Sequence, residues 1–335
     1  MIISKTPFRV SFFGGGTDFP LWYKKKEGLI ISSTIDKYCY VLLRTLPPFF
    51  SFKYRLRYYQ TELQKNISQI KHPVIKAALK NFNKKKNGLE ISHFADVPAL
   101  SGLGASSAFT VSIVNAIYAY NNKKITKNEI AKKAIYLEQK ILKENVGSQD
   151  QIATAFGGFN FISFKRNKFS VNKIKMDSSI LNELQNRLVL IYINSSRKAD
   201  IIEKKKMQSL EKNVAYYDRL LEIAHEAKNV FSSNSNKILF ETGRLLNETW
   251  HVKKKLDKSV SNSTVDNLYE FGIKNGAVAG KLLGAGSGGF FLFLSKSFQE
   301  KRKLINSFKR NMHVDFKFED LGTRIILNKK DYYDV

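Results

Sequence analysis

A glycine-rich stretch at residues 98–108, with the sequence PALSGLGASSA, leads directly into a helix predicted over residues 106–120. Backbone N–H groups at the start of a helix lack partners within it, and the helix dipole is positive there. Small side chains let phosphate oxygens approach such a backbone closely, and a serine hydroxyl in the first turn can ligate Mg²⁺. The stretch therefore indicates a phosphate-binding loop, the alternative being a tight turn whose serines only cap the helix. It is not a Walker A loop, because G-x-x-x-x-G-K-[ST] occurs nowhere in the chain.

A second cluster of small and polar residues follows the first predicted strand, at residues 12–18. Its three glycines, at 14–16, permit close backbone approach to a bound molecule, and Thr17 and Asp18 can hydrogen-bond hydroxyl groups. Arg9 lies within the strand itself, where a charge needs a partner if its face is buried. The cluster predicts a binding loop, and the alternative is a turn stabilised by Asp18.

Two carboxylates, Asp150 and Glu138, lie at positions that permit either a functional or a structural role. Asp150 falls in the first turn of a short predicted helix capped by Ser148, where acidic residues are common for dipole reasons alone. Glu138 falls on the apolar stripe of a helix predicted over 127–144, which a capping box at Thr126–Glu129 begins. A carboxylate on that stripe is costly unless a cation or a donor meets it. The alternative is that Glu138 lies at the edge of the stripe and reaches water.

The sequence lacks the motifs of dinucleotide binding, of histidine metal sites and of two common catalytic sites. Residues 284–289, GAGSGG, formally satisfy the dinucleotide pattern G-x-G-x-x-G, but a predicted strand follows them rather than a helix. The five histidines are scattered without the spacing of metal ligands. Neither a G-x-S-x-G elbow nor an H-R-D catalytic loop occurs. These observations exclude a dinucleotide fold, a histidine metal centre and both catalytic motifs.

The elements that must position these residues change in character along the chain. Apolar alternation makes the first half rich in predicted strands, whereas helical periodicity dominates the second half. This order indicates an α+β protein of two domains, 1–190 and 191–335, with a boundary near 185–195. Further predicted elements are strands at 2–13, 29–44, 290–294, 314–318 and 323–327, and helices at 201–230, 236–256, 263–275 and 299–310.

Residues 49–59 interleave aromatic and basic side chains and support two interpretations. Proteins that bind single-stranded nucleic acid combine aromatics and cations in this way. The strict alternation from Phe50 to Tyr58 is also the period of a half-buried strand with a solvated basic face. We favour the strand.

Composition bounds the remaining possibilities. The chain has 335 residues, of which 43% are hydrophobic, enough for packed cores in two domains. The 56 Lys and Arg residues against 29 Asp and Glu give a net charge of +27, which favours anionic ligands, although a solvated lysine-rich surface is the simpler explanation. No run of about 18 apolar residues exists and the N-terminus lacks signal-peptide features. Cys39 is the single cysteine and fits a reducing compartment, so we expect a cytoplasmic protein.

The three glycine-rich segments, taken in order, resemble the GHMP kinases, a family that includes galactokinase, homoserine kinase, mevalonate kinase and phosphomevalonate kinase. Residues 6–18 and 284–289 resemble the first and third family motifs. Residues 98–108 resemble the ATP loop P-x-x-x-G-L-G-S-S-A, with Ala105 where a serine is common. The GGGTD segment, the NVGSQDQ sequence at 145–151 and the loop in the 280s most resemble the branch that acts on D-glycero-D-manno-heptose 7-phosphate.

The resemblance implies roles for single residues. Ser106 and Glu138 align with the Mg²⁺ ligands, which would explain a carboxylate on an apolar stripe. Asp150 aligns with the catalytic aspartate that accepts the proton of the substrate hydroxyl or orients it, and Arg9 with the basic residue that pairs with it. The ATP triphosphate would be held by Gly102, Leu103, Gly104, Ala105, Ser106 and Ser107. The sugar would be held by Gly15, Gly16, Thr17 and Asp18.

The resemblance also implies an ATP- and Mg²⁺-dependent sugar kinase with its active site in the cleft between the domains. The reaction would phosphorylate the anomeric oxygen of the heptose 7-phosphate, for nucleotide-activated heptose and surface polysaccharide. Galactokinases carry Glu-His where this chain has Gly15-Gly16, which leaves room for a longer substrate. The alternatives are another anomeric kinase, for fucose or galactose, and a basic nucleic-acid-binding protein. We expect a small sugar phosphate as partner, neither nucleic acid nor membrane, and a monomer or homodimer.

Overall fold

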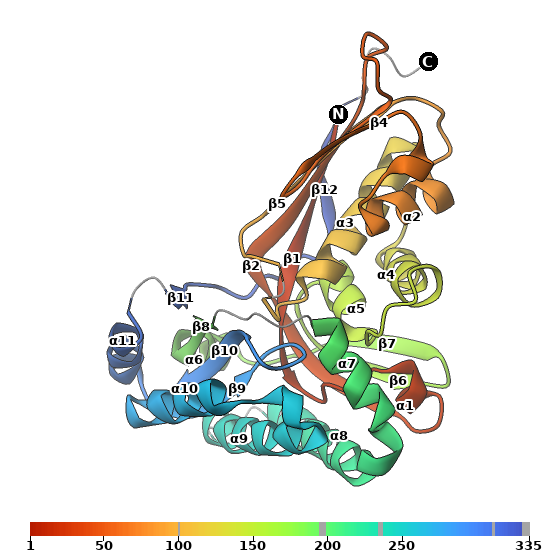
Figure 1. Ribbon diagram of the computed structural model, residues 1–335. Coiled ribbons are helices and arrows are strands. Elements are labelled where there is room, and N and C mark those ends of the chain that lie inside the picture. The colour runs from red at the N-terminus through yellow and green to blue at the C-terminus, as the bar shows by residue number, and fades with distance from the viewer. Residues whose placement is uncertain (100, 194–198, 234–236, 310–311, 330–335) are drawn as a thin grey trace.

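In the computed structural model, which describes residues 1–99, 101–193, 199–233, 237–309 and 312–329, two β-sheets are flanked by helices (Figure 1). The predicted α+β class is confirmed. Within the described residues, the larger sheet runs β12-β1-β2-β5-β3-β4, with β6 paired to β2 and β7 paired to β6. Its strands are β1 (Ile2–Phe13), β2 (Gly28–Thr45), β3 (Tyr54–Arg57), β4 (Thr61–Gln64), β5 (Leu89–Ala95), β6 (Phe159–Lys165), β7 (Lys168–Lys173) and β12 (Arg324–Asn328).

Helices of the first half of the chain lie on one side of this sheet (Figure 1). They are α2 (Pro73–Phe82), α3 (Ala105–Tyr120), α4 (Lys127–Tyr136) and α5 (Gln149–Phe156), and a short helix α1 (Pro20–Tyr23) follows β1. The central helix α3 packs against β1 and β2, and most of its side chains are buried because α2, α4 and α5 surround it. Its N-terminus, and with it the glycine-rich loop, is thereby fixed against the sheet.

The second sheet, ordered β11-β8-β10-β9, is antiparallel throughout. Its strands are β8 (Leu188–Ile193), β9 (Ala277–Leu282), β10 (Gly289–Ser295) and β11 (His313–Val314). The helices of the second half of the chain are α6 (Ser178–Arg187), α7 (Ala199–Gln208), α8 (Val214–Ser232), α9 (Ile238–Leu256), α10 (Ser263–Lys274) and α11 (Phe298–Ser307), of which α9, α10 and α11 pack against this sheet. Every residue of β10 is buried, which confirms the apolar strand predicted at 290–294.

The first strand lies where the two halves of the chain meet. Residues 2–6 of β1 alternate between buried and partly exposed positions, as in a half-buried strand, whereas residues 7–13 are buried throughout. This burial has a direct cause, since β1 contacts α3 and α5 of the first half and also α8 and α9 of the second half. Arg9 is therefore placed in an interior that both halves enclose.

Several predicted elements differ from the structure. The capping box at Thr126–Glu129 begins α4 as predicted, but the α-helix gives way to a π-helical turn, η2 (Leu137–Ile141), well before residue 144. The helix predicted at 201–230 is broken between α7 and α8 by a 3₁₀ turn, η3 (Leu210–Asn213). Helical periodicity continues across both irregularities, so the apolar pattern alone does not reveal them.

The strands predicted at 49–59 and 314–318 are much shorter than expected. Only 54–57 pair as β3, and Phe50 is 41% exposed because residues 49–53 lie outside the sheet. Beyond β11, the segment around Phe318 makes only a single bridge to Ile35 among the described residues. The alternating pattern therefore extends beyond the residues that pair with a neighbouring strand.

The last strand, β12, returns to the first sheet and pairs with β1. The predicted boundary between residues 190 and 191 falls within β8, and the division at that point stays a prediction. Among the helices of the described residues, none combines the length and the apolar character needed to cross a membrane.

Candidate active site

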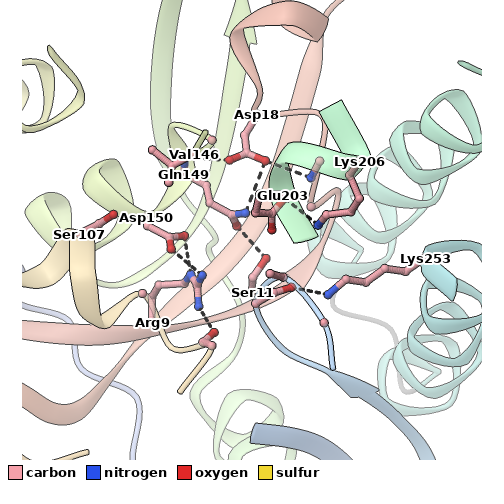
Figure 2. A pocket seen from close by; sticks show the side chains of 18 of the residues that line it. Arg9, Ser11, Asp18, Ser107, Val146, Gln149, Asp150, Glu203, Lys206 and Lys253 are labelled. Atoms are coloured by element: carbon pink, nitrogen blue, oxygen red, sulfur yellow. Dashed lines mark hydrogen bonds and ion pairs between the residues drawn. The ribbon is translucent and has the colours of Figure 1, made fainter. Parts of the chain in front are cut away.

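A cavity lies where the C-terminal end of β1, the start of α3 and the start of α5 face α7, α9 and the loop after β9. Most of the predicted site residues line it, namely Arg9, Gly15, Gly16, Asp18, Gly102, Gly104, Ala105, Ser106, Ser107 and Asp150. Leu103, Thr17 and Glu138 do not line it. The fold thus brings three separated glycine-rich segments to one place. Figure 2 labels Asp18 and Ser107, which belong to two of these segments.

Arg9 and Asp150 form a bidentate ion pair at the centre of this cavity (Figure 2). Arg9 Nε donates to Asp150 Oδ1 and Nη2 donates to Oδ2, both at 2.7 Å. The remaining Nη1 donates to the carbonyl oxygen of Gly102 at 2.6 Å. Arg9 is only 3% exposed, so its charge requires these partners. The pairing expected for these two residues is confirmed, and the same guanidinium fixes the glycine-rich loop beside the carboxylate.

The glycine-rich loop is held by close backbone packing. Gly102 and Gly104 have φ values of 77° and 74°, a left-handed conformation that favours glycine. A Cβ at Gly102 would lie 2.7 Å from the carbonyl oxygen of Leu283, and one at Gly284 would lie 2.6 Å from the Gly102 Cα. The third glycine-rich segment therefore forms the wall behind the loop. The helix begins at Ala105, directly after Gly104, so its first N–H groups face the cavity side of the loop.

Of the two serines that open α3, it is Ser107 that contacts Glu138. Ser107 Oγ donates to Glu138 Oε2 at 3.0 Å, and the Gln151 side-chain amide donates to the same oxygen. Ser106 is exposed and lines the cavity one residue earlier. The structure thus brings Glu138 to the loop as predicted, but through a serine that the resemblance placed only in the ATP loop.

Glu138 is 1% exposed, and this burial raises the pKa of its carboxyl to about 7. The Oε1 atom has no hydrogen-bond partner in the structure. A buried carboxylate oxygen without a partner next to a phosphate-type loop suits a hard cation, because Mg²⁺ prefers one or two carboxylates completed by phosphate oxygens and water. The residues at this position therefore fit Mg²⁺. Among the described residues, no group of three or more histidine, cysteine, aspartate or glutamate side chains forms a self-sufficient metal site.

The segment 14–18 divides into positions that line the cavity and positions that stabilise the turn. Thr17 is fully buried, and its hydroxyl donates to the carbonyl of Gly14 at 2.8 Å and accepts from the amide of Leu29 at 3.1 Å. It is thus occupied in the turn and does not reach the cavity, contrary to the expected contact with the sugar. A Cβ at Gly15 would meet nothing closer than 4.0 Å, whereas one at Gly16 would lie 2.8 Å from the Tyr217 ring. The space left by the two glycines is therefore open only at Gly15.

Asp18 lies at the cavity wall and is 1% exposed. Its carboxylate accepts from the amides of Gly16 at 3.0 Å and Gln149 at 3.1 Å, and a Cβ at Gly147 would collide with it at 1.9 Å. Burial, with the nearby charge of Asp150, raises the pKa of Asp18 to about 6. The residue therefore fastens the first glycine segment to the start of α5. The Gly16 amide donates to this carboxylate and is therefore not available to a substrate anion.

The cavity also includes five charged or polar residues from the second half of the chain that were not predicted as site residues. They are Glu203 and Lys206 on α7, Thr249 and Lys253 on α9, and Lys281 on β9. Lys253 lies on the buried stripe of α9 between Thr249 and Leu256. A charged residue on an apolar helical stripe was the observation that singled out Glu138, and the same test applied to α9 finds Lys253. Lys206 was hidden in a run of three lysines.

The basic segment at 49–59 lies outside this cavity, and its cations have a local partner. Arg55 and Arg57 each approach Glu90 at 3.4 Å, and Arg44 approaches it at 2.6 Å. Arg55 also lies over the ring of Phe50, at 4.5 Å from its centroid. These cations balance a buried carboxylate, which weakens the case for a nucleic-acid surface here.

Comparison with known proteins places the chain in a family. Residues 72–158 match the GHMP kinase N-terminal domain, and residues 239–314 match the GHMP kinase C-terminal domain. The chain is 32% identical, over 96% of its length and 98% of the relative's, to the D-glycero-alpha-D-manno-heptose 7-phosphate kinase of Campylobacter jejuni. The chain belongs to the GHMP kinase family. The kinase class expected from the three glycine-rich segments is confirmed.

Two further relatives of this GHMP kinase act on different sugars according to their names. The crystal structure of a D-glycero-D-manno-heptose 1-phosphate kinase from Bacteroides thetaiotaomicron superposes with a TM-score of 0.77 at 26% identity, covering 99% of this chain and 100% of that one. The bifunctional fucokinase/GDP-fucose pyrophosphorylase of Arabidopsis thaliana is 26% identical over 93% of this chain, which spans 31% of that protein. The resemblance to the heptose branch of the family is confirmed.

Proposed function

We propose that this GHMP kinase transfers the γ-phosphoryl group of ATP to the anomeric hydroxyl of D-glycero-D-manno-heptose 7-phosphate, giving the 1,7-bisphosphate. The observation that carries the proposal is the bidentate Arg9–Asp150 pair, which opens into the cavity beside the loop at the start of α3. The full-length similarity to a relative that bears the heptose 7-phosphate kinase name supports the choice of substrate.

In this proposal the loop from Gly102 to Ser107 holds the ATP triphosphate through backbone N–H groups at the start of α3. Asp150 accepts a hydrogen bond from the anomeric hydroxyl and orients it toward the γ-phosphate, and Arg9 holds that carboxylate in place. A loose phosphoryl-transfer transition state needs positioning and charge neutralisation more than a strong base. An aspartate whose two oxygens accept from Nε and Nη2 of one arginine suits positioning.

The proposal includes Mg²⁺ held by Glu138 together with a serine hydroxyl of the loop. The unpartnered Glu138 Oε1 supports this role, and Ser106, which lines the cavity, is the serine expected from the family resemblance. When bound, the ion would neutralise charge on the transferring phosphoryl group. Ser107 and Gln151 would orient the carboxylate, since both donate to its other oxygen.

Open space at Gly15 and the positive charge of the whole chain support a phosphorylated seven-carbon sugar. Gly15 leaves open space, and the net charge of +27 attracts a doubly charged sugar phosphate. The names of the relatives differ in the position of the phosphate, 7 in one and 1 in the other. An anomeric acceptor requires a free anomeric hydroxyl, so we propose the 7-phosphate. The product would supply nucleotide-activated heptose for a surface polysaccharide, in the cytoplasm.

A coupled ADP-release assay over a panel of acceptors tests the proposal. The panel contains heptose 7-phosphate, heptose 1-phosphate, free heptose, galactose and fucose, each at saturating ATP and Mg²⁺. We expect the largest kcat/KM for the 7-phosphate and a ³¹P resonance of a new anomeric phosphate in the product. A larger kcat/KM for fucose or galactose would overturn the heptose assignment and leave the kinase assignment standing. A larger value for the 1-phosphate would move the acceptor hydroxyl away from the anomeric carbon.

A further inference from the structure

On one side of the cavity, a buried lysine of α9 bonds only to the backbone, and a buried lysine of α7 is paired with one carboxylate. Lys253 Nζ donates to the carbonyl oxygens of Leu282 at 3.0 Å and Gly284 at 2.6 Å, and among the described residues no carboxylate pairs with it. Lys206 approaches Glu203 at 2.7 Å. Both lysines are more than nine-tenths buried and line the cavity. A buried ammonium group bonded only to neutral carbonyls retains an unmet attraction for an anion.

A neighbouring polar group points to a ligand independently. Thr249 lies one helical turn before Lys253 on α9, lines the same cavity and is 1% exposed. Its hydroxyl has no hydrogen-bond partner in the structure. A buried hydroxyl without a partner is costly, and a phosphate oxygen would accept from it. Thr249 and Lys253 therefore present one hydroxyl and one ammonium group on the same face of α9.

The lysines and the start of α3 lie on different sides of the Arg9–Asp150 ion pair. In Figure 2, Lys206 and Lys253 lie on the opposite side of Arg9 and Asp150 from Ser107. Because the acceptor hydroxyl must lie at Asp150, with the ATP phosphates on the Ser107 side, the remainder of the sugar extends toward the lysines. A seven-carbon sugar activated at its anomeric carbon carries its phosphate at the far end of the chain, away from the reacting oxygen.

We infer that Lys253 and Lys206, with the hydroxyl of Thr249, bind the phosphate group of the acceptor sugar. The inference rests on the proposed function and names the residues that would select a phosphorylated acceptor. Burial and the charges of Lys281 and Lys206 hold the pKa of Lys253 well below its ordinary value, and a phosphate dianion would relieve that repulsion. Such a contact consists of charge-assisted hydrogen bonds, which are among the stronger polar contacts in proteins.

Lysine-to-methionine substitutions test the inference, because methionine keeps the apolar length of the side chain and removes the charge. For Lys253→Met and Lys206→Met, we expect kcat/KM for heptose 7-phosphate to fall about 10- to 100-fold, the usual range for a lost hydrogen bond to a charged group. We expect kcat/KM for free heptose to change less than about threefold and KM for ATP to stay unchanged. Lys255→Met is the matched control, since Lys255 is exposed on the same helix and its loss removes the same charge.

Each other outcome overturns the inference. Equal losses for phosphorylated and free heptose would give the lysines a structural role, and a higher KM for ATP would assign them to the ATP phosphates. If either lysine variant unfolds at assay temperature, Thr249→Val serves instead, with an expected loss of about 3- to 10-fold that is confined to the phosphorylated sugar. If free heptose turns over too slowly, calorimetric binding of both sugars without ATP gives the same ratio. Wild-type preference for an unphosphorylated sugar would refute the proposed function itself, whereas unchanged heptose 7-phosphate selectivity in the variants would refute only this inference.

Discussion

The two ends of the cavity differ in how their charges and their glycines are used. At the glycine-rich loop, the guanidinium of Arg9 is matched by Asp150, and the backbone of Gly102 lies against Leu283 so closely that even a methyl group would collide. At the other end, Lys253 and Lys281 bond only to carbonyl oxygens, and Gly15 has open space before it.

The difference reflects what each end has to hold. A loop that is already packed and charge-balanced presents fixed N–H groups, which suits one unvarying ligand, the triphosphate. An end with open volume and unbalanced cations becomes complementary only when an anionic ligand enters. We expect substitutions at the first end to damage catalysis with every acceptor, and substitutions at the second end to change the choice of acceptor.

The largest effect should follow Asp150→Asn, which keeps the size of the side chain and removes its charge. We expect turnover to fall about 10²- to 10⁴-fold with every sugar, the typical contribution of a positioned acid or base group. ATP affinity should remain, because the loop contributes its own backbone donors. Asp320→Asn is the control, since that side chain is 71% exposed and lies outside the cavity. Near-normal turnover of Asp150→Asn would refute the catalytic role.

A pair of glycine-to-alanine changes compares the two ends directly. Gly102→Ala places a Cβ at 2.7 Å from the Leu283 carbonyl and requires a left-handed backbone that costs alanine about 1–2 kcal/mol. We expect at least a tenfold rise in KM for ATP, because a shift of about 1 Å near the reacting groups can cost about 100-fold. Gly15→Ala, with open space, should change kcat/KM less than about threefold. Equal effects of the two changes would remove the contrast between the ends.

Filling the open end with a carboxylate should change acceptor preference. Gly15→Glu adds bulk and a negative charge where the sugar phosphate is proposed to lie, so we expect about a tenfold loss of kcat/KM for heptose 7-phosphate. Gly15→Gln is the matched control, because it adds nearly the same volume without the charge. The glutamate variant should lose more than the glutamine variant, and the gap should narrow in high salt. Identical losses would show that volume alone matters.

Glu138→Gln should change the response to Mg²⁺ and leave acceptor choice intact. A neutral amide is a weaker ligand for a hard cation than a carboxylate, so the Mg²⁺ concentration that gives half-maximal activity should rise several-fold. The ratio of kcat/KM values for phosphorylated and free heptose should not move. An unchanged Mg²⁺ titration accompanied by altered thermal stability would make Glu138 a structural residue.

The same variant carries a pH prediction for the protein without metal. The pKa of Glu138 is about 7 when folded, against an ordinary value of 4.5. Between these values the folded protein binds more protons than the unfolded chain, so stability falls as pH rises through the window and stays low above pH 7. The loss amounts to about 3 kcal/mol at about 1.4 kcal/mol per pKa unit. Urea unfolding in a chelator at pH 5 and pH 8 should show this loss in the wild type, with a smaller loss in Glu138→Gln. Equal pH dependence would contradict the prediction.

The sequence carried the parts of the site that depend on local chemistry. Glycines at fixed spacing before a helix predict a phosphate loop because only small residues permit close backbone approach. Arg9 in a strand and Glu138 on an apolar stripe were recognisable because a buried charge must have a partner. These arguments need only the period of a helix or strand, and both residues are buried as they require.

Only the tertiary structure decided which of the polar and charged side chains line the cavity. Thr17 and Asp18 are adjacent and can both hydrogen-bond a sugar, yet the Thr17 hydroxyl bonds to the backbone of Gly14 and Leu29, whereas Asp18 lines the cavity. Lys206 and Lys253 lie among lysines that are mostly exposed, and only the tertiary packing of α7 and α9 buries these two. Residues about 200 positions apart meet because helices of both halves pack against β1, and no periodicity along the chain predicts that contact. The sequence by itself therefore determined the phosphate loop, the carboxylates and the class of reaction, whereas the folded molecule decided which cations face the acceptor.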